Sequence, residues 1–160
     1  MASDIIVIER KLLKSQVYRS LTSTSKDVYN NFLMKRVIAK TKARPGRKSE
    51  SVILNNGEIE YCYSEAEKEG IPRASFMRAI TELVEKGFID IAHSGSGGVK
   101  GDKSLYSISD RWRTWGTEEY IQKVRPKDIR AKRGFLSGDK HWKRKKLMSK
   151  SKIISFKNDK

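Results

Sequence analysis

The spacing of apolar residues predicts two helices at the start of the chain. Apolar side chains recur at helical spacing over residues 12–21, and a longer apolar stripe extends over residues 28–37. A hydroxyl can cap a helix by accepting a hydrogen bond from a free amide of the first turn, so Ser23 or Ser25 is expected to begin the second helix. These helices carry enough apolar surface either to close a core or to form a two-fold interface, which leaves a homodimer open.

A short hairpin is predicted next along the chain. Residues 52–54 are all apolar, apolar and polar side chains alternate over residues 59–63, and an Asn-Asn-Gly turn signal occupies residues 55–57 between them. Cys62 is expected to pack inside this hairpin. The preceding residues 41–50, TKARPGRKSE, combine basic side chains with Pro and Gly and therefore predict a loop.

A short helix, a tight turn and a longer helix are predicted after the hairpin. Ser64 and Glu67 have the spacing of a capping box, and Gly70 suits the end of this short helix. Pro72 suits the first turn of the longer helix, which is expected to end at Gly87. One face of the longer helix is apolar and carries Phe76, Met77, Ile80, Leu83 and Val84.

Two strands complete the pattern, at residues 88–92 and 105–108, with the glycine-rich and basic loop SGSGGVKGDK between them. The order helix, turn, helix, strand, loop, strand is typical of a helix-turn-helix with a wing, which presents its second helix to the DNA major groove. We therefore expect an α+β fold, namely a single winged helix-turn-helix domain with N-terminal helices and a small β-hairpin wing. Trp112 and Trp115 follow the last strand and are expected to cover the base of this domain.

The first half of the longer helix is the candidate DNA-reading surface. Its outward side carries Arg73, Ala74, Ser75 and Arg78. Arg78 is the first choice for a base contact, because a guanidinium can donate two parallel hydrogen bonds to guanine. Arg73, near the helix start, is expected to contact phosphate. Glu82 and Glu85 are expected on the same outward side in the half that lies farther from the DNA backbone. The alternative for these arginines is a purely solvated surface.

The charge of the chain points to a polyanionic partner. It has 35 Lys and Arg against 19 Asp and Glu, a net charge of +16, which favours nucleic acid. From residue 123 to the end there are 15 basic and 3 acidic residues. We therefore predict a nearly balanced domain over residues 1–122 and a flexible basic extension over residues 123–160 with little stable structure of its own.

Further basic residues are predicted to contact phosphates. They are Lys100 and Lys103 in the wing and Lys143, Arg144, Lys145 and Lys146 in the extension. The wing lysines would contact phosphate or the minor groove. The extension cluster, beside Trp142, would add salt-sensitive, non-specific affinity. The alternative is that the charged hairpin tip and extension only keep the protein in solution.

Other function classes are disfavoured. A single cysteine, Cys62, excludes an internal disulfide, and with only His93 and His141 beside it a structural zinc site is not expected. No clustered carboxylates complete a catalytic site, so we expect no enzymatic activity and no cofactor. No apolar run reaches the roughly 18 residues that cross a bilayer, and residues 1–10 lack a signal-peptide pattern. We therefore expect a cytoplasmic, nucleoid-associated protein without a membrane partner.

Three blocks of the sequence resemble a group of winged-helix proteins. The blocks are LLKSQVYRSLTSTSKDVYNNFLMKR (12–36), LNNGEIEYCYSEAEKEGIPRASFMRAITELVEKGFIDI (54–91) and SLYSISDRWRTWGT (104–117). They are similar to the N-terminal winged-helix domains of plasmid and phage replication initiators and to small stand-alone winged-helix proteins of mobile elements. The resemblance implies double-stranded DNA binding, with residues 64–69 as supporting helix, 72–86 as recognition helix and 95–103 as wing.

The expected function is therefore non-enzymatic, sequence-dependent binding of double-stranded DNA, in replication initiation or transcriptional control of a prokaryotic mobile element or phage. One alternative is an RNA-binding or ribosome-associated protein, in which the basic extension provides most of the affinity. Another is an adaptor that uses the winged helix to contact a protein. Loss of the extension would remove nearly all binding in the RNA case, and Arg78→Ala would leave DNA affinity unchanged in the adaptor case.

Overall fold

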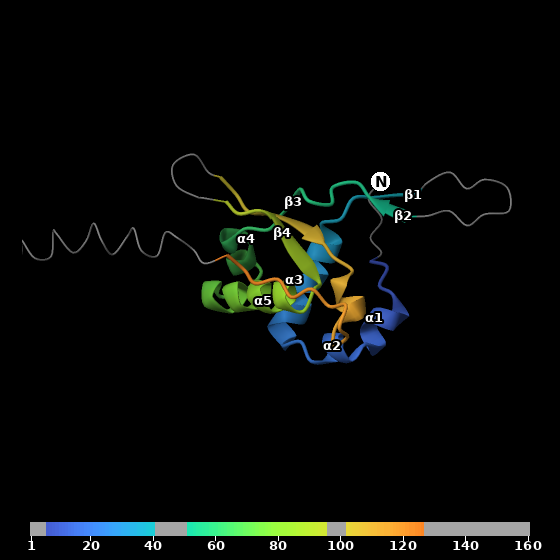
Figure 1. The fold of residues 1–160 in the computed structure, drawn as a ribbon. Helices are drawn as coiled ribbons and strands as arrows, with labels where there is room; N and C mark the ends of the chain where they lie inside the picture. Colours follow the sequence, from blue (N-terminus) through green and yellow to red (C-terminus); the bar gives the residue numbers. More distant parts are fainter. Residues whose placement is uncertain (1–5, 41–50, 96–101, 127–160) are drawn as a thin grey trace, which may run out of the picture. The chain divides into compact units, whose positions relative to one another are not determined.

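The computed structural model describes residues 6–40, 51–95 and 102–126 (Figure 1). The elements follow in the order α1 (Arg10–Lys14), α2 (Gln16–Arg19), α3 (Ser23–Met34), β1 (Ile38–Lys40), β2 (Ser51–Ile53), β3 (Ile59–Glu60), α4 (Tyr63–Lys68), α5 (Arg73–Glu85), β4 (Ile89–His93), β5 (Leu105–Ile108) and the 3-10 helix η1 (Arg111–Thr114). The predicted α+β class is confirmed. These residues, as far as Arg125, belong to one compact unit.

The core forms where α3 and α5 pack against each other beside a three-stranded sheet. Phe88, at the end of the helix-to-strand turn, is fully buried and contacts Tyr29 of α3 edge-to-face at a centroid distance of 5.2 Å. The indole of Trp112 stacks on the other side of Phe88 at 6.1 Å. The predicted core position of Trp112 is thus confirmed, whereas that of Trp115 is wrong, because 39% of Trp115 is exposed.

The three-stranded sheet is antiparallel and has the order β3-β5-β4. Tyr106 lies in the middle strand, with Ile59 of β3 opposite it on one side and Ile91 of β4 on the other. The ring of Tyr106 packs on Phe32 of α3 at 5.1 Å, so the central strand contacts the helical layer directly. A separate antiparallel pair is formed by β1 and β2.

The predicted hairpin around residues 55–57 is wrong. Residues 51–53 pair with β1, whereas residues 59–60 pair with β5. The amide of Asn55 accepts from Val37 N and donates to the carbonyl of Lys35, both at 2.9 Å. The amide of Asn56 accepts from Ile108 N at 2.7 Å. The Asn-Asn-Gly turn itself is present, since Glu58 N donates to the carbonyl of Asn55 at 3.0 Å. The side chains of the two asparagines, however, bind segments distant in the sequence, and the strands on either side of the turn do not pair with each other.

The N-terminal helices differ from the predicted pattern at their ends. The first predicted helix is interrupted at Ser15, which has extended backbone angles and caps α2 by accepting a hydrogen bond from Tyr18 N. Its hydroxyl also donates to the carbonyl of Leu12 at 2.6 Å, the competition with helical bonding that serine side chains offer. The cap of α3 is Thr22 rather than Ser23 or Ser25.

The short and long helices of the middle segment are confirmed, with shifted starts. The helix α4 begins at Tyr63 and has Cys62 at its N-cap, so the predicted Ser64 capping box and the predicted place of Cys62 inside a hairpin are both wrong. Pro72 is the N-cap of α5. Gly87 ends this helix with φ +79, and a Cβ there would lie 2.8 Å from the Cβ of Arg111. Only glycine fits this position without strain.

A search of the described helices for a span that could cross a membrane finds none long and apolar enough.

Candidate nucleic-acid interface

The helix α5 is fixed against α3 by the carboxylate of Glu82. Its Oε2 accepts from the hydroxyls of Ser25 at 2.5 Å and Thr22 at 2.9 Å, and its Oε1 accepts from Lys86 Nζ at 2.7 Å. Burial alone would raise the pKa of Glu82, but these hydrogen bonds outweigh it and lower the pKa. The predicted outward position of Glu82 is therefore wrong, because the residue joins the two helices that form the core.

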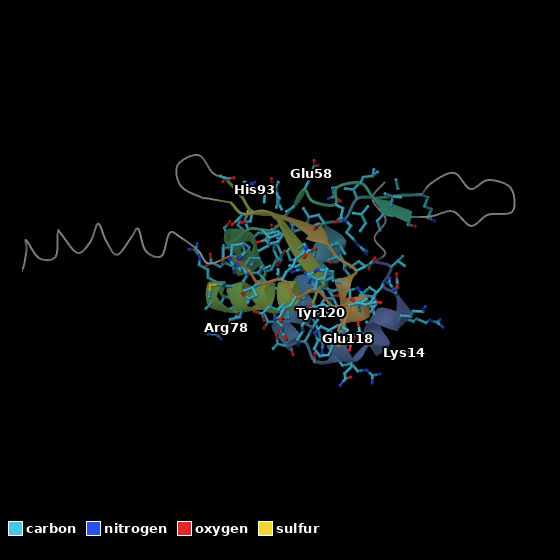
Figure 2. The ribbon with its side chains drawn as sticks, in the orientation of Figure 1. Lys14, Glu58, Arg78, His93, Glu118 and Tyr120 are labelled. Atoms are coloured by element: carbon cyan, nitrogen blue, oxygen red, sulfur yellow. The ribbon has the colours of Figure 1, made fainter. Side chains whose placement is uncertain are left out.

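The first half of α5 is the exposed half. Arg73, Ala74 and Arg78 are exposed, and Ser75 is half-buried. Met77 is 47% exposed, so its predicted place on the apolar face is wrong. The guanidinium of Arg78 forms no hydrogen bond or ion pair with the other residues that the structure describes. Figure 2 shows Arg78 beside the first half of α5, directed away from the ribbon.

Arg73, unlike Arg78, has an ion-pair partner among the described residues. Its Nε donates to Glu67 of α4 at 2.8 Å, and both side chains are largely exposed. An exposed ion pair of this kind contributes about 0–1 kcal/mol, so an incoming phosphate can replace Glu67 at small cost. Arg73 is thus held near the start of α5 in the absence of a ligand and can be released to one.

The predicted wing and extension residues are only partly described. Lys103 lies just before β5, and its Nζ donates to Glu60 of β3 at 2.6 Å, with both side chains about half exposed. At the same end of the hairpin, His93 Nε2 and Asp102 Oδ1 lie 2.8 Å apart. Lys100, like Lys143, Arg144, Lys145 and Lys146, lies outside the described residues. The structure therefore describes only Lys103 of the predicted phosphate contacts beyond α5.

The glutamates of α4 lie close to this surface and each has a partner. Besides Glu67, the carboxylate of Glu65 accepts a hydrogen bond from Lys35, which lowers the pKa of Glu65. The carboxylate of Glu69 accepts from Asn31 Nδ2 at 2.6 Å and from the hydroxyl of Tyr61. The cations paired with Glu65 and Glu67 offset part of the negative charge beside α5, which would otherwise repel a polyanion, whereas the partners of Glu69 are neutral.

The sequence pattern missed two basic residues that contact the compact unit, and one of them, Arg125, lies beside the first half of α5. Arg125 Nη2 donates to the hydroxyl of Tyr63 at 2.9 Å, and its Nη1 donates to the carbonyl of Met77 at 3.3 Å. Lys123 Nζ forms an ion pair with Asp90 at 3.0 Å. Both follow the predicted boundary after residue 122, in a segment whose composition resembles the rest of the extension. The residues gave no periodic signal that could have assigned them to the folded unit.

Comparison with protein-family models, curated proteins and solved structures finds no match for this chain. Function must therefore be inferred from the surface itself. Among the described residues, no three His, Cys, Asp or Glu side chains lie together in a way that could hold a metal ion. What the surface does offer is an exposed helix half with an arginine, Arg78, that has no partner in the part of the chain that the structure describes.

Proposed function

We propose that this chain binds double-stranded DNA in a sequence-dependent manner through a winged helix-turn-helix. In this proposal α5 is the recognition helix, α4 is the supporting helix and the β4–β5 hairpin is the wing. The element order α3-β3-α4-α5-β4-β5 and the sheet order β3-β5-β4 support it, since a helix-turn-helix followed directly by a hairpin is the arrangement that brings its second helix to the major groove.

The observation that carries the proposal is Arg78, exposed and without a partner among the described residues, on the outward half of α5. Buried or paired arginines have a structural role that accounts for them, whereas Arg78 is exposed and forms no hydrogen bond or ion pair with the other described residues. A guanidinium on a groove-sized helix is the commonest reader of guanine, through hydrogen bonds to O6 and N7. Ser75, which can accept or donate, and the small Ala74 flank it and leave room for base edges.

The distribution of charge supports a polyanion as the partner. The described residues carry 17 Lys and Arg against 14 Asp and Glu. Most of the net charge of +16 therefore lies in residues 41–50, 96–101 and 127–160. Basic segments in the same chain as a recognition helix supply salt-dependent, sequence-independent affinity, while the recognition helix supplies the preference for a DNA sequence. In keeping with the resemblance, we place this activity in replication initiation or transcriptional control of a mobile element or phage.

Replacing Arg78 by alanine tests the proposal. We expect the variant to lose about tenfold or more in affinity for the preferred duplex, and much less for a duplex of mixed sequence, because one bidentate base contact contributes about 1–3 kcal/mol of discrimination. Equilibrium binding at physiological salt measures both losses. The matched control is Arg10→Ala, which removes an exposed and likewise unpartnered arginine on α1, far from α5 in Figure 1.

Equal losses in the two variants, or equal losses of Arg78→Ala on both duplexes, would contradict a base-reading role. An unchanged affinity of Arg78→Ala would favour a protein adaptor. Stronger binding to structured RNA than to any duplex DNA would favour an RNA-binding protein.

A further inference from the structure

The segment after η1 returns along α5. At Gly116, with φ +84, the chain changes direction and enters Thr117–Arg125, which we call the strap. The hydroxyl of Tyr120 donates to the carbonyl of Glu85, at the end of α5, and Arg125 donates to the carbonyl of Met77, in its first half. The strap therefore runs antiparallel to α5 over about 12 Å of its length, as Figure 1 shows in orange.

The middle of the strap is fixed by a half-buried ion-pair cluster. Arg111 Nη1 donates to the carbonyl of Ile121 at 2.9 Å, while its Nη2 donates to the carbonyl of Val84 at 3.0 Å and to Asp90 Oδ1 at 2.5 Å. Asp90 Oδ2 accepts from Lys123 at 3.0 Å. The strap is thus bound to the end of α5 and to β4 at once, mainly through Arg111 and Asp90, whose side chains are largely removed from water.

The end of the strap is fixed beside the candidate DNA-reading surface. Arg125 joins Tyr63 of α4 to Met77 of α5, and Met77 is the immediate neighbour of Arg78. Both acceptors of Arg125 are neutral, so among the described residues no carboxylate compensates its charge. The covalent continuation from this point carries thirteen Lys and Arg against three Asp over residues 127–160.

We infer that the strap fixes the origin of the basic C-terminal region beside the first half of α5, so that both bind the phosphate backbone and bases of one DNA duplex. This inference rests on the proposed function. A flexible cation chain that starts at an arbitrary point contributes only through its average concentration near the DNA. One that starts beside the reading helix has a high effective concentration at the phosphates that flank the contacted groove.

The test releases the strap without changing the charge of the full chain. The variant Arg111→Lys/Tyr120→Phe/Arg125→Lys removes the guanidinium bonds of Arg111 to the carbonyls of Ile121 and Val84, the hydroxyl bond to Glu85 and the two-acceptor bridge of Arg125. The ion pair of Lys123 with Asp90 remains, but Lys123 is half exposed, so this pair alone holds the strap weakly. The matched control, Arg10→Lys/Tyr18→Phe/Arg19→Lys, makes the same chemical changes on α1 and α2, where none of the three side chains has a hydrogen-bond partner among the described residues. Thermal unfolding followed by circular dichroism checks that both variants are folded.

The readout is directed DNA cleavage by the full chain on a selected duplex, with an iron chelate on a cysteine introduced as Asp128→Cys in a Cys62→Ser background. With the strap intact, we expect cuts within one narrow window at a constant distance from the α5 site. With the strap released, we expect the cuts to spread along the duplex and the affinity to fall about tenfold. The control is expected to behave like the parent chain.

An unchanged narrow window in the released variant would overturn the inference alone, because duplex binding itself would still be observed. A spread pattern in the parent chain with its strap intact would overturn it as well. A full chain that binds no duplex DNA at physiological salt would overturn the proposed function together with the inference.

Discussion

Ending the chain after Pro126 is expected to weaken binding to duplex DNA by about two orders of magnitude or more at physiological salt, while the order of preference among duplex sequences is retained. Residues 127–160 hold thirteen of the 35 Lys and Arg. For every phosphate that these residues no longer neutralise, the negative slope of log K against log salt also becomes less steep by about 0.9. The cut is placed after Pro126 because Lys123 and Arg125 bind the compact unit. Titration at several salt concentrations measures both effects.

A graded variant of the full chain serves as the control for this truncation. It replaces the basic residues that are predicted to bind phosphate by glutamine, in Lys143→Gln, Arg144→Gln, Lys145→Gln and Lys146→Gln. Up to four phosphates are then no longer neutralised, so we expect the negative slope of log K against log salt to become less steep by up to about 3.6. The sequence preference is expected to be unchanged. Loss of the preference in either protein would mean that the C-terminal region reads sequence, contrary to the role assigned to α5. Nearly complete loss of binding on truncation, with no preference left, would favour the RNA-binding alternative.

Replacing Arg111 by alanine is expected to lower the free energy of unfolding by about 3 kcal/mol. The change leaves the carboxylate of Asp90 half-buried beside Lys123 alone and removes the donor to the carbonyls of Val84 and Ile121. Urea denaturation of the full chain, followed by tryptophan fluorescence, measures the loss. A large effect is expected because the guanidinium joins α5, β4 and the strap at one point.

The matched control is Arg113→Ala on the same 3-10 helix. Arg113 pairs with Glu9 at 2.8 Å on the surface, so its removal is expected to cost less than about 1 kcal/mol. Similar losses in the two variants would contradict the structural role of Arg111.

Burial alone would raise the pKa of Asp90, but the hydrogen bonds from Arg111 and Lys123 lower it below its ordinary value of 3.8. The contribution of Asp90 to stability is therefore full above that value and is lost as the pH falls below it.

Helical periodicity predicted the part of the fold that carries the candidate site. The apolar positions of α5 repeat at helical spacing, and Gly70 and Gly87, which end α4 and α5, both have positive φ. These signals are local, since a helix face and a left-handed turn depend on neighbouring residues only. The exposure of Arg73 and Arg78 followed from the same periodicity.

The errors occurred where a side chain binds a segment far away in the sequence. Asn55 and Asn56 have the composition of a tight turn, but their amides bind the end of α3 and the strand β5. Glu82 has the spacing of a surface residue, but it binds Ser25 across 57 positions. Arg125 belongs to a basic stretch, but it binds Tyr63 across 62 positions. Local patterns contain no information about such interactions, which tertiary packing alone creates.

The central claim, that α5 reads the sequence of duplex DNA, is tested most directly by selection from a random double-stranded library at physiological salt. Physiological salt is used because low salt enhances binding by every basic protein. The selection compares the full chain with its Arg78→Ala variant. We expect the full chain to enrich a defined motif, and the variant to bind DNA but to lose the preference at one or more positions of that motif. Recovery of no motif, or of the same motif with equal strength by the Arg78→Ala variant, would contradict the claim.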